Sequence, residues 1–274
     1  MRLDRALVAR GLVQSRTRAQ QLIDAGDVSV DGVVVSKSAM DVRDDAEVTV
    51  HTAGEDFVSR AAHKLVGALE ACPQIDVVGR TCLDVGASTG GFTQVLLERG
   101  AVRVHAIDVG HGQLSPVVAS DPRVVAREGL NARELTSEHL GGERPDLVVA
   151  DVSFISLTLL VEPLLATCAE DVDLLLMVKP QFEVGRERLG KGGVVTNRDD
   201  RARAVARVVD ALTTAGLSIH RIARSALPGP HGNVEFFVWA SRAWQARGGS
   251  RPRPDALTEG LVRASIEDQT GGTP

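Results

Sequence analysis

Acidic side chains accompany two of the short apolar runs in the sequence. Asp84 lies in the run 82–85, two residues before Gly86, and Asp108 directly follows the run 104–107. A carboxylate at the end of a second strand can accept hydrogen bonds from both hydroxyls of a cofactor ribose. The carboxylate of Asp84 would repel a pyrophosphate, but it could act through water on the cationic end of a methionine-type ligand. Together the two acids indicate a nucleoside cofactor that carries a cationic group.

Glycines join the first of these runs to the segment that follows it. Glycines at a strand-to-helix turn let the backbone approach a ligand closely and leave N–H groups of the helix available. A dinucleotide site would have the spacing G-x-G-x-x-G, whereas this loop reads G-x-x-x-G-G, with Ser88 in place of the second glycine. The loop therefore favours S-adenosylmethionine over NAD. The predicted cofactor contacts are Asp84, Gly86, Ala87, Ser88, Gly90, Gly91, Phe92, Asp108, Val109, Asn131 and Asp151.

Four ionisable residues stand at the ends of predicted elements, where open α/β sheets place their ligands. They are Lys64, Asp151, Lys179 and Glu235. A buried lysine beside a second cation can act as a general base near neutral pH, and a carboxylate can orient it. We expect Lys179 to be the base that activates a hydroxyl, Asp151 and Glu235 to orient it, and Lys64 to stabilise the developing alkoxide. Taken singly, each residue is better explained by a surface ion pair, and it is their combination with the cofactor loop that favours the catalytic interpretation.

The elements that must position these residues alternate between apolar runs and helical segments. Unbroken apolar strands that alternate with helices indicate a mainly parallel sheet covered on both faces, which is an α/β fold. We expect seven strands, at 82–85, 104–107, 124–126, 147–150, 174–178, 218–223 and 236–240. A linker at 248–254 and a helix at 255–267 should end the chain.

The first 50 residues predict a small α+β module. Apolar residues at helical spacing indicate a helix from Leu3 to about Leu12 and a second helix that Ser15 caps and Gly26 ends. Val28 to Val35 reads as two strands joined by a tight turn at Asp31-Gly32, and 47–50 as another strand. Five arginines and one acid lie among residues 1–20, although the net charge of the chain is −5. A basic start on an acidic protein suggests a local phosphate-binding face, with a solvated helix face as the alternative.

Composition excludes several classes of protein. No apolar stretch approaches the roughly 20 residues that span a bilayer, and no signal peptide follows Met1, so we expect a cytoplasmic protein. Cys72, Cys82 and Cys168 are scattered without zinc-ligand spacing, so we expect neither a disulfide framework nor a metal site.

The N-terminal pattern resembles the RNA-binding module first seen in the fourth small-subunit ribosomal protein. The matching residues are Leu3-Asp4, Gly11-Leu12, Ser15-Arg16, Ala19, Ile23, Gly26, Val28 and Val30-Asp31-Gly32. The resemblance implies that a basic face of the helix pair contacts structured RNA. The candidate RNA contacts are Arg2, Arg5, Arg10, Arg16, Arg18, Lys37 and, beyond the module, Arg60.

The rest of the chain resembles the FtsJ-like ribose 2′-O-methyltransferases, which have a class I, Rossmann-like fold. That family uses a lysine–aspartate–lysine–glutamate tetrad in the chain order of Lys64, Asp151, Lys179 and Glu235, and its first motif looks like residues 84–92. Ser88-Thr89 departs from the family's loop. The resemblance implies S-adenosylmethionine as cofactor, no metal, and a last strand that lies antiparallel in the sheet.

End to end, the chain is similar to the TlyA family, which joins such an RNA module to an FtsJ-like domain. The segments 58–65, 84–92, 151–157, 178–184 and 233–235 carry this resemblance. It implies methylation of cytidine 2′-hydroxyls in 16S ribosomal RNA, 23S ribosomal RNA or both, and an effect on capreomycin and viomycin susceptibility. We also expect a monomer. Phe57 stands where a tryptophan is expected. We predict an RNA-binding domain at 1–50, a linker at 51–60, a methyltransferase domain at 61–247, and a linker with a helix at 248–274.

Rival functions have weaker support. Enzymes that methylate exocyclic amines carry an Asn/Asp-Pro-Pro-aromatic run after the fourth strand, where this chain has Asp151-Val152-Ser153-Phe154. Cytosine C5 methylation needs a cysteine nucleophile, and we expect Cys168 to lie in a helix. A non-catalytic RNA-binding or assembly factor would not need the tetrad. A haemolysin, a label that the TlyA family often carries, would need a membrane-inserting segment.

Overall fold

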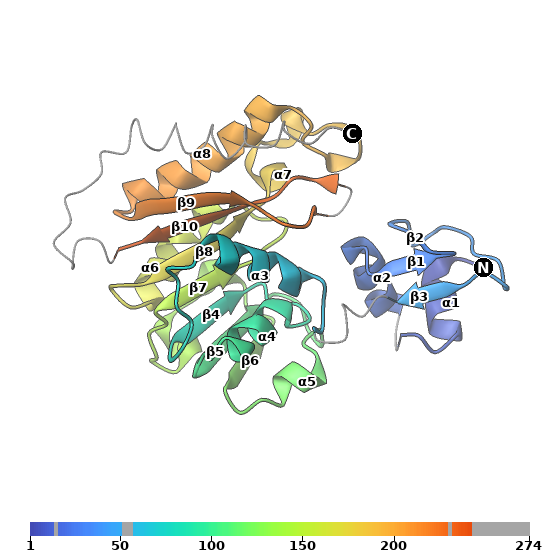
Figure 1. Cartoon of the computed structure of the whole chain (residues 1–274), viewed down its shortest axis with the longest axis horizontal. Coiled ribbons are helices and arrows are strands. Elements are labelled where there is room, and N and C mark those ends of the chain that lie inside the picture. The colour runs from blue at the N-terminus through green and yellow to red at the C-terminus, as the bar shows by residue number, and fades with distance from the viewer. Residues whose placement is uncertain (14–15, 51–56, 230–231, 243–274) are drawn as a thin grey trace.

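The computed structural model describes residues 1–13, 16–50, 57–229 and 232–242. Its strands form two separate sheets, one of three strands in the N-terminal module and one of seven strands in the larger domain (Figure 1). Ser15, most of the linker at 51–60, and the linker and helix predicted within 248–274 lie outside the described residues. The structure confirms the predicted α/β class and the small α+β module.

The N-terminal module packs two helices on a small antiparallel sheet. Its core is formed by apolar residues that the helical and strand spacing predicted, among them Leu3, Leu7, Ile23 and Val28, all fully buried. Asp31 and Gly32 have φ values of 49° and 78°, the left-handed pair that a two-residue hairpin turn requires. The elements are α1 Leu3–Ala9, α2 Arg16–Ala25, β1 Val28–Val30, β2 Val33–Val34 and β3 Val48–Val50, in the sheet order β2-β1-β3.

The large sheet has the order β6-β5-β4-β7-β8-β10-β9. Strands β4 to β8 pair in parallel, and β10 pairs antiparallel with both β8 and β9, as the family resemblance implied. All seven predicted strands are present. Their bounds are β4 Thr81–Val85, β5 Arg103–Asp108, β6 Val124–Glu128, β7 Leu147–Ala150, β8 Asp173–Val178, β9 Ser218–Arg224 and β10 Phe236–Ser241.

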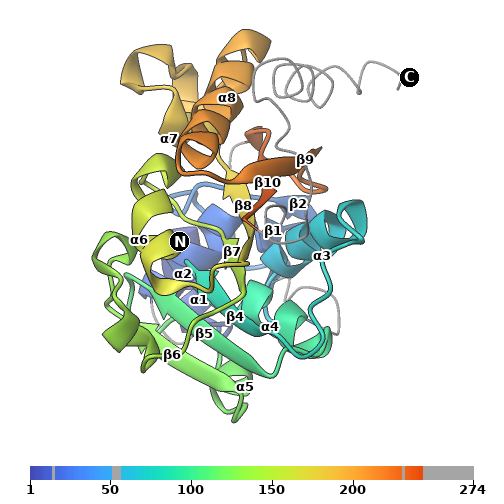
Figure 2. The same cartoon turned by 90° about the vertical axis from the view of Figure 1, so that its left-hand side faces the viewer.

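Helices cover both faces of this sheet, which explains why its central strands are apolar throughout. Leu65 of α3 and Leu96 of α4 belong to the core on one face, and Leu164 of α6 and Val208 of α8 to the core on the other (Figure 2). The helices are α3 Ala61–Ala71, α4 Gly91–Glu98, α5 Pro116–Ala119, α6 Val161–Thr167, α7 Pro180–Glu183 and α8 Arg198–Thr214, with 3-10 turns at 132–134, 137–140, 157–159, 186–188 and 191–193.

The strand order reverses between β4 and β7, because β5 lies on one side of β4 and β7 on the other. At such a switch point the loops after neighbouring parallel strands diverge and leave a crevice at the carboxyl ends. The predicted site residues at 84–92, 108 and 151 lie at or directly after the carboxyl ends of β4, β5 and β7, so they meet at this edge of the sheet.

Candidate active site

The loop after β4 has a backbone that its glycines make possible. Gly86 has φ of +83°, and a Cβ atom there would lie 2.6 Å from the carbonyl oxygen of Asp151. No other residue fits, because the loops after β4 and β7 are in direct contact at this point. Ser88 also has a positive φ, 48°, which is uncommon for a residue with a side chain.

Asp84 is fully buried beneath this loop. Its Oδ2 atom accepts a hydrogen bond of 2.6 Å from the hydroxyl of Thr93, whereas its Oδ1 atom has no hydrogen-bond partner in the described part of the chain. Burial raises the pKa of Asp84 to about 7, and the nearby charges of Asp151 and Asp108 add to this rise. A buried carboxylate oxygen without a donor is suited to a cationic group, directly or through water.

Asp108 accepts hydrogen bonds from the loop after β4 and also lines a cavity. Its Oδ2 atom accepts from the Ser88 N–H at 2.9 Å and its Oδ1 atom from the Gly110 N–H at 2.7 Å, which leaves lone pairs on both oxygens for further donors. The Asn131 side chain accepts from the Arg133 N–H at 3.1 Å. One cavity is lined by six of the predicted cofactor contacts, namely Gly86, Ser88, Asp108, Val109, Asn131 and Asp151.

The remaining predicted cofactor contacts lie elsewhere. Ala87, Gly91 and Phe92 line a neighbouring cavity that also reaches Ser88 and Asp151, and the Phe92 ring stacks 6.2 Å from that of Phe237 in the core. Asp84 and Gly90 are in neither lining. The donor and acceptor set nevertheless fits S-adenosylmethionine, with paired acceptors at Asp108 and an unpartnered acidic oxygen at Asp84.

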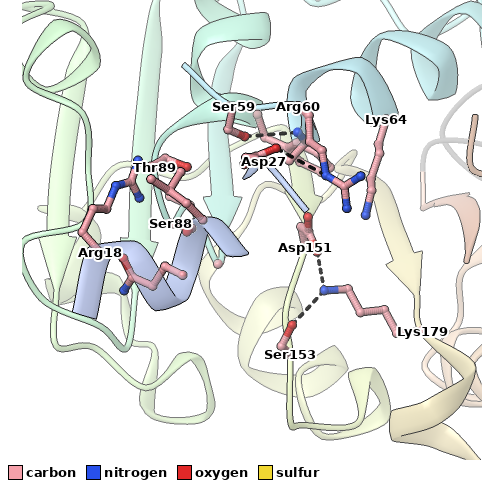
Figure 3. Close-up of a pocket in the computed structure, with 17 residues that line it drawn as sticks. Arg18, Asp27, Ser59, Arg60, Lys64, Ser88, Thr89, Asp151, Ser153 and Lys179 are labelled. Carbon is pink, nitrogen blue, oxygen red and sulfur yellow. Dashed lines mark hydrogen bonds and ion pairs between the residues drawn. The ribbon is translucent and has the colours of Figure 1, made fainter. Parts of the chain in front are cut away.

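The predicted tetrad consists of two lysine–acid pairs. Lys179 Nζ lies 2.6 Å from Asp151 Oδ1 and donates to the Ser153 hydroxyl at 2.8 Å (Figure 3). Lys64 Nζ lies 2.6 Å from Glu235 Oε2. The Lys64–Glu235 pair is closed from solvent, with side chains 6% and 0% exposed, whereas Asp151 remains 16% exposed.

This pairing differs from our expectation for Glu235. We expected Glu235 to orient Lys179, and the structure places its carboxylate on Lys64 instead. Sequence order could not reveal this, because Glu235 precedes the antiparallel strand β10 and its reach depends on that strand's register. Burial would raise the pKa of Asp151, but the charges of Lys179 and then Lys64 outweigh it and hold that pKa below its ordinary value. Asp151 is therefore an anion beside both lysines.

The candidate RNA contacts of the N-terminal module are largely exposed but are not equivalent. Arg2 and Arg16 both contact the buried carboxylate of Asp4, at 3.1 and 2.7 Å, and hydrogen bonds from Arg2 and Arg16 hold the pKa of Asp4 well below its usual range. Arg10 donates to the carbonyls of Arg43, Asp44 and Ala46. Arg5 and Lys37 are exposed.

Two further candidate RNA contacts lie at the junction with the larger domain. Arg18 of α2 lines the same cavity as Lys64, Asp151 and Lys179, together with Gln21 of the same helix. Arg60 contacts the buried carboxylate of Asp27 at 3.5 Å. Figure 3 shows Arg18 beside Ser88 and Thr89, and Arg60 beside Asp27. Arg60 therefore links the two domains in this structure, a contact that the sequence did not indicate.

Sequence reasoning missed several residues of the site. Ser153 was noted only as part of the segment 151–157, although it contacts Lys179. Phe154 is 91% exposed with φ of +66°, and its ring lies 5.2 Å from that of Phe182. The Glu128 carboxylate accepts from the N–H groups of Gly112, Gln113 and Leu114 and so orders the loop after β5. A serine, an exposed phenylalanine and a loop-binding glutamate have no spacing that marks them in a single sequence.

The described residues contain neither a metal-binding cluster nor a membrane-spanning helix. Within the described residues, no group of three or more His, Cys, Asp or Glu side chains is arranged to hold a metal ion. In that same part of the chain, every helix is too short or too polar to cross a bilayer.

Comparison with known proteins gives consistent matches over most of the chain. Residues 57–242 match the model of the FtsJ-like methyltransferases, and residues 1–48 match that of the S4 domain. A Mycobacterium tuberculosis protein named 16S/23S rRNA (cytidine-2′-O)-methyltransferase TlyA is 50% identical, over 94% of this chain and 98% of its own. A Brachyspira hyodysenteriae protein named Hemolysin A is 38% identical, over 87% and 98%. A solved structure from Streptococcus thermophilus is 31% identical with a TM-score of 0.70, over 97% of this chain and 95% of that one.

Proposed function

The chain belongs to the TlyA family of FtsJ-like methyltransferases, and we propose that it transfers a methyl group from S-adenosylmethionine to the ribose 2′-hydroxyl of a cytidine in ribosomal RNA. The observation that carries this proposal is the pairing of Lys179 with Asp151, and of Lys64 with Glu235, beside the cavity lined by Gly86, Asp108 and Asn131. A non-catalytic RNA-binding protein has no need for two lysines held at this edge of the sheet.

In the proposed reaction, S-adenosylmethionine supplies the electrophilic methyl group when it is bound. Asp108 would hold the cofactor's ribose hydroxyls, and Asp84 would compensate the charge of its methionine end. Lys179 takes the proton of the 2′-hydroxyl, while Asp151 and Ser153 fix the direction of its Nζ atom. Lys64 stabilises the oxygen as negative charge develops on it, and Glu235 keeps Lys64 in place.

The N-terminal module supports the choice of RNA as substrate. Its helix α2 contributes Arg18 and Gln21 to the cavity that contains the tetrad lysines. The lining includes four cations, Arg18, Arg60, Lys64 and Lys179, but only two acids, Asp27 and Asp151. A cavity with more cations than acids is suited to bind the phosphates on either side of a target ribose. We propose that Arg2, Arg5, Arg10, Arg16, Arg18 and Lys37 contact phosphates.

Transfer of labelled methyl from S-adenosylmethionine to unmethylated 30S and 50S subunits tests the function. We expect label on at least one subunit, in a linkage that resists alkali, because a methylated 2′-oxygen cannot attack its own phosphodiester. Mapping the resistant bond locates the nucleotide. Label in an alkali-labile position, or no label while the cofactor still binds, would contradict the proposal.

The finer points of the assignment are proposals that follow from the same family. We propose the domain division at residues 1–50, 51–60, 61–247 and 248–274, and a monomer that uses no metal. Loss of the enzyme should lower susceptibility to capreomycin and viomycin. Deletion of the gene, with complementation by wild type and by Lys179→Ala, tests whether this effect requires methylation.

A further inference from the structure

One buried carboxylate joins the loop after β7 to the turn after β8. Glu183 of α7 is 2% exposed, and its Oε2 atom accepts a hydrogen bond of 2.5 Å from the hydroxyl of Ser156. Its Oε1 atom accepts from the Leu157 N–H at 2.8 Å. Glu183 follows Lys179 by four residues, and Ser156 follows Asp151 by five. The contact therefore connects the two segments that carry the Lys179–Asp151 pair.

A carboxylate in this position is costly to bury, so its contacts must compensate it. Burial raises the pKa of Glu183, opposed by the hydrogen bonds from Ser156 and Leu157 and by the charge of Arg207. Arg207 of α8 also donates to the main-chain carbonyl of Glu183 at 3.0 Å. A glutamate that served only to fill space could be replaced by an apolar side chain, whereas here both oxygens accept hydrogen bonds from one loop.

The loop that Glu183 contacts has a backbone that requires support. Phe154 lies in its middle with φ of +66°, a conformation that costs free energy for any residue with a Cβ atom. At one end, the Asp151 N–H donates to the carbonyl of Val85 at 2.9 Å, and at the other end Glu183 accepts from Ser156 and Leu157. Ser153, which accepts from Lys179, lies between these two attachments.

We propose that Glu183 is a positioning residue for methyl transfer, whose carboxylate holds the 151–157 loop so that Asp151 and Ser153 both reach Lys179. This inference rests on the proposed function. Without the contact, the loop keeps its hydrogen bond at Asp151 and the packing of Phe154 and Leu157, but no hydrogen bond to Glu183 fixes its far end, and Ser153 moves away from the amine. Residues 151–156 of this loop also line the cavity at Gly86, Asp108 and Asn131, so the contact supports that cavity as well, and its larger effect falls on the orientation of Lys179.

The test compares Glu183→Ala, Glu183→Gln and Ser156→Ala with Glu162→Gln, an exposed glutamate on α6, as the matched control. Single-turnover methylation of the subunit that wild type labels, cofactor affinity, RNA affinity and thermal stability are measured on each full-length protein. We expect Glu183→Ala to lower the methylation rate about 100-fold, with RNA affinity nearly unchanged and cofactor affinity lowered by a smaller factor than the rate, because residues 151–156 also line the cofactor cavity. Glu183→Gln should recover at least a tenth of the wild-type rate, because an amide can accept from Leu157 and donate to Ser156.

The split between rate and affinity, together with the recovery in Glu183→Gln, separates positioning from a purely structural role. Wild-type rates in Glu183→Ala and Ser156→Ala would overturn the inference, as would a loss of rate, cofactor affinity and stability by the same factor. If Glu183→Ala does not fold, the same outcomes are read from Ser156→Ala and Glu183→Gln. Absence of label with wild type would instead contradict the proposed function.

Discussion

The two domains use their basic side chains in different ways. In the N-terminal module, Arg2 and Arg16 lie 44% and 56% exposed around one buried acid, Asp4. In the larger domain, Lys64 and Lys179 are 6% and 9% exposed, and each has its own acid. The arginine heads of the module thus stay open to solvent around a shared acid, whereas breaking a buried pair such as Lys64–Glu235 costs about 3–5 kcal/mol. The exposed arginines of the module are thus suited to bind a polyanion, whereas the buried lysine–acid pairs of the larger domain are suited to act on one bound group.

Lys179→Ala tests the catalytic role of the buried lysine–acid pairs. We expect the methylation rate to fall about 10²–10⁴-fold, because the variant has no group to take the hydroxyl proton. Cofactor affinity should be nearly unchanged, because Lys179 does not line the cavity that contains Asp108 and Asn131. Single-turnover methylation and calorimetric titration with S-adenosylmethionine give the two values. Arg203→Ala, at an exposed pair on α8, is the control. Equal losses of rate and affinity would remove Lys179 from the catalytic assignment.

Glu235→Ala tests whether the second pair is needed for stability as well as for chemistry. The change leaves the Lys64 ammonium buried without its partner, so the free energy of unfolding should fall by about 3–5 kcal/mol. The double variant Lys64→Met with Glu235→Leu should recover most of this loss and remain inactive. Urea denaturation and single-turnover methylation separate the two effects. An active double variant would show that the pair has only a structural role.

The same contrast explains what the sequence could and could not predict. Periodicity and glycines predicted the seven strands, the two-domain division of elements and the edge where Asp84, Asp108 and Asp151 meet, because these depend on local spacing. The partner of Glu235 depends on the register of β10, and the contact of Glu183 with Ser156 joins residues 27 positions apart. The RNA contact at Arg60 stays a prediction, whereas its ion pair with Asp27 of the N-terminal module was not predicted. Long-range pairing of common polar residues leaves no pattern in one chain.

Asp84 allows a prediction that depends on pH. Its pKa is raised to about 7 in the structure, so below this pH the carboxyl binds a proton that a cationic ligand must displace. Cofactor affinity should therefore weaken by up to about tenfold for each pH unit below 7 and level off above it. Calorimetric titrations between pH 5.5 and 8, in buffers of different ionisation enthalpy, report the affinity and the proton released. Asp84→Asn should bind more weakly and without this slope. A slope that persists in Asp84→Asn would assign the proton to another group.

The smallest effect is expected from the basic face of the module, where charges are exposed and screened by salt. Arg16→Ala with Arg18→Ala should weaken RNA binding up to about tenfold. The slope of log affinity against log salt concentration should become shallower by about 0.7–0.9 for each phosphate that the variant no longer binds. Cofactor affinity should not change, and Arg198→Ala with Arg203→Ala on α8 is the matched control. Unchanged RNA affinity would show that the proposed basic face is wrong.

The single variants then separate the two arginines, because Arg18 shares a cavity with Lys179 whereas Arg16 contacts Asp4. Arg18→Ala should also slow methylation at saturating RNA, whereas Arg16→Ala should reduce affinity alone.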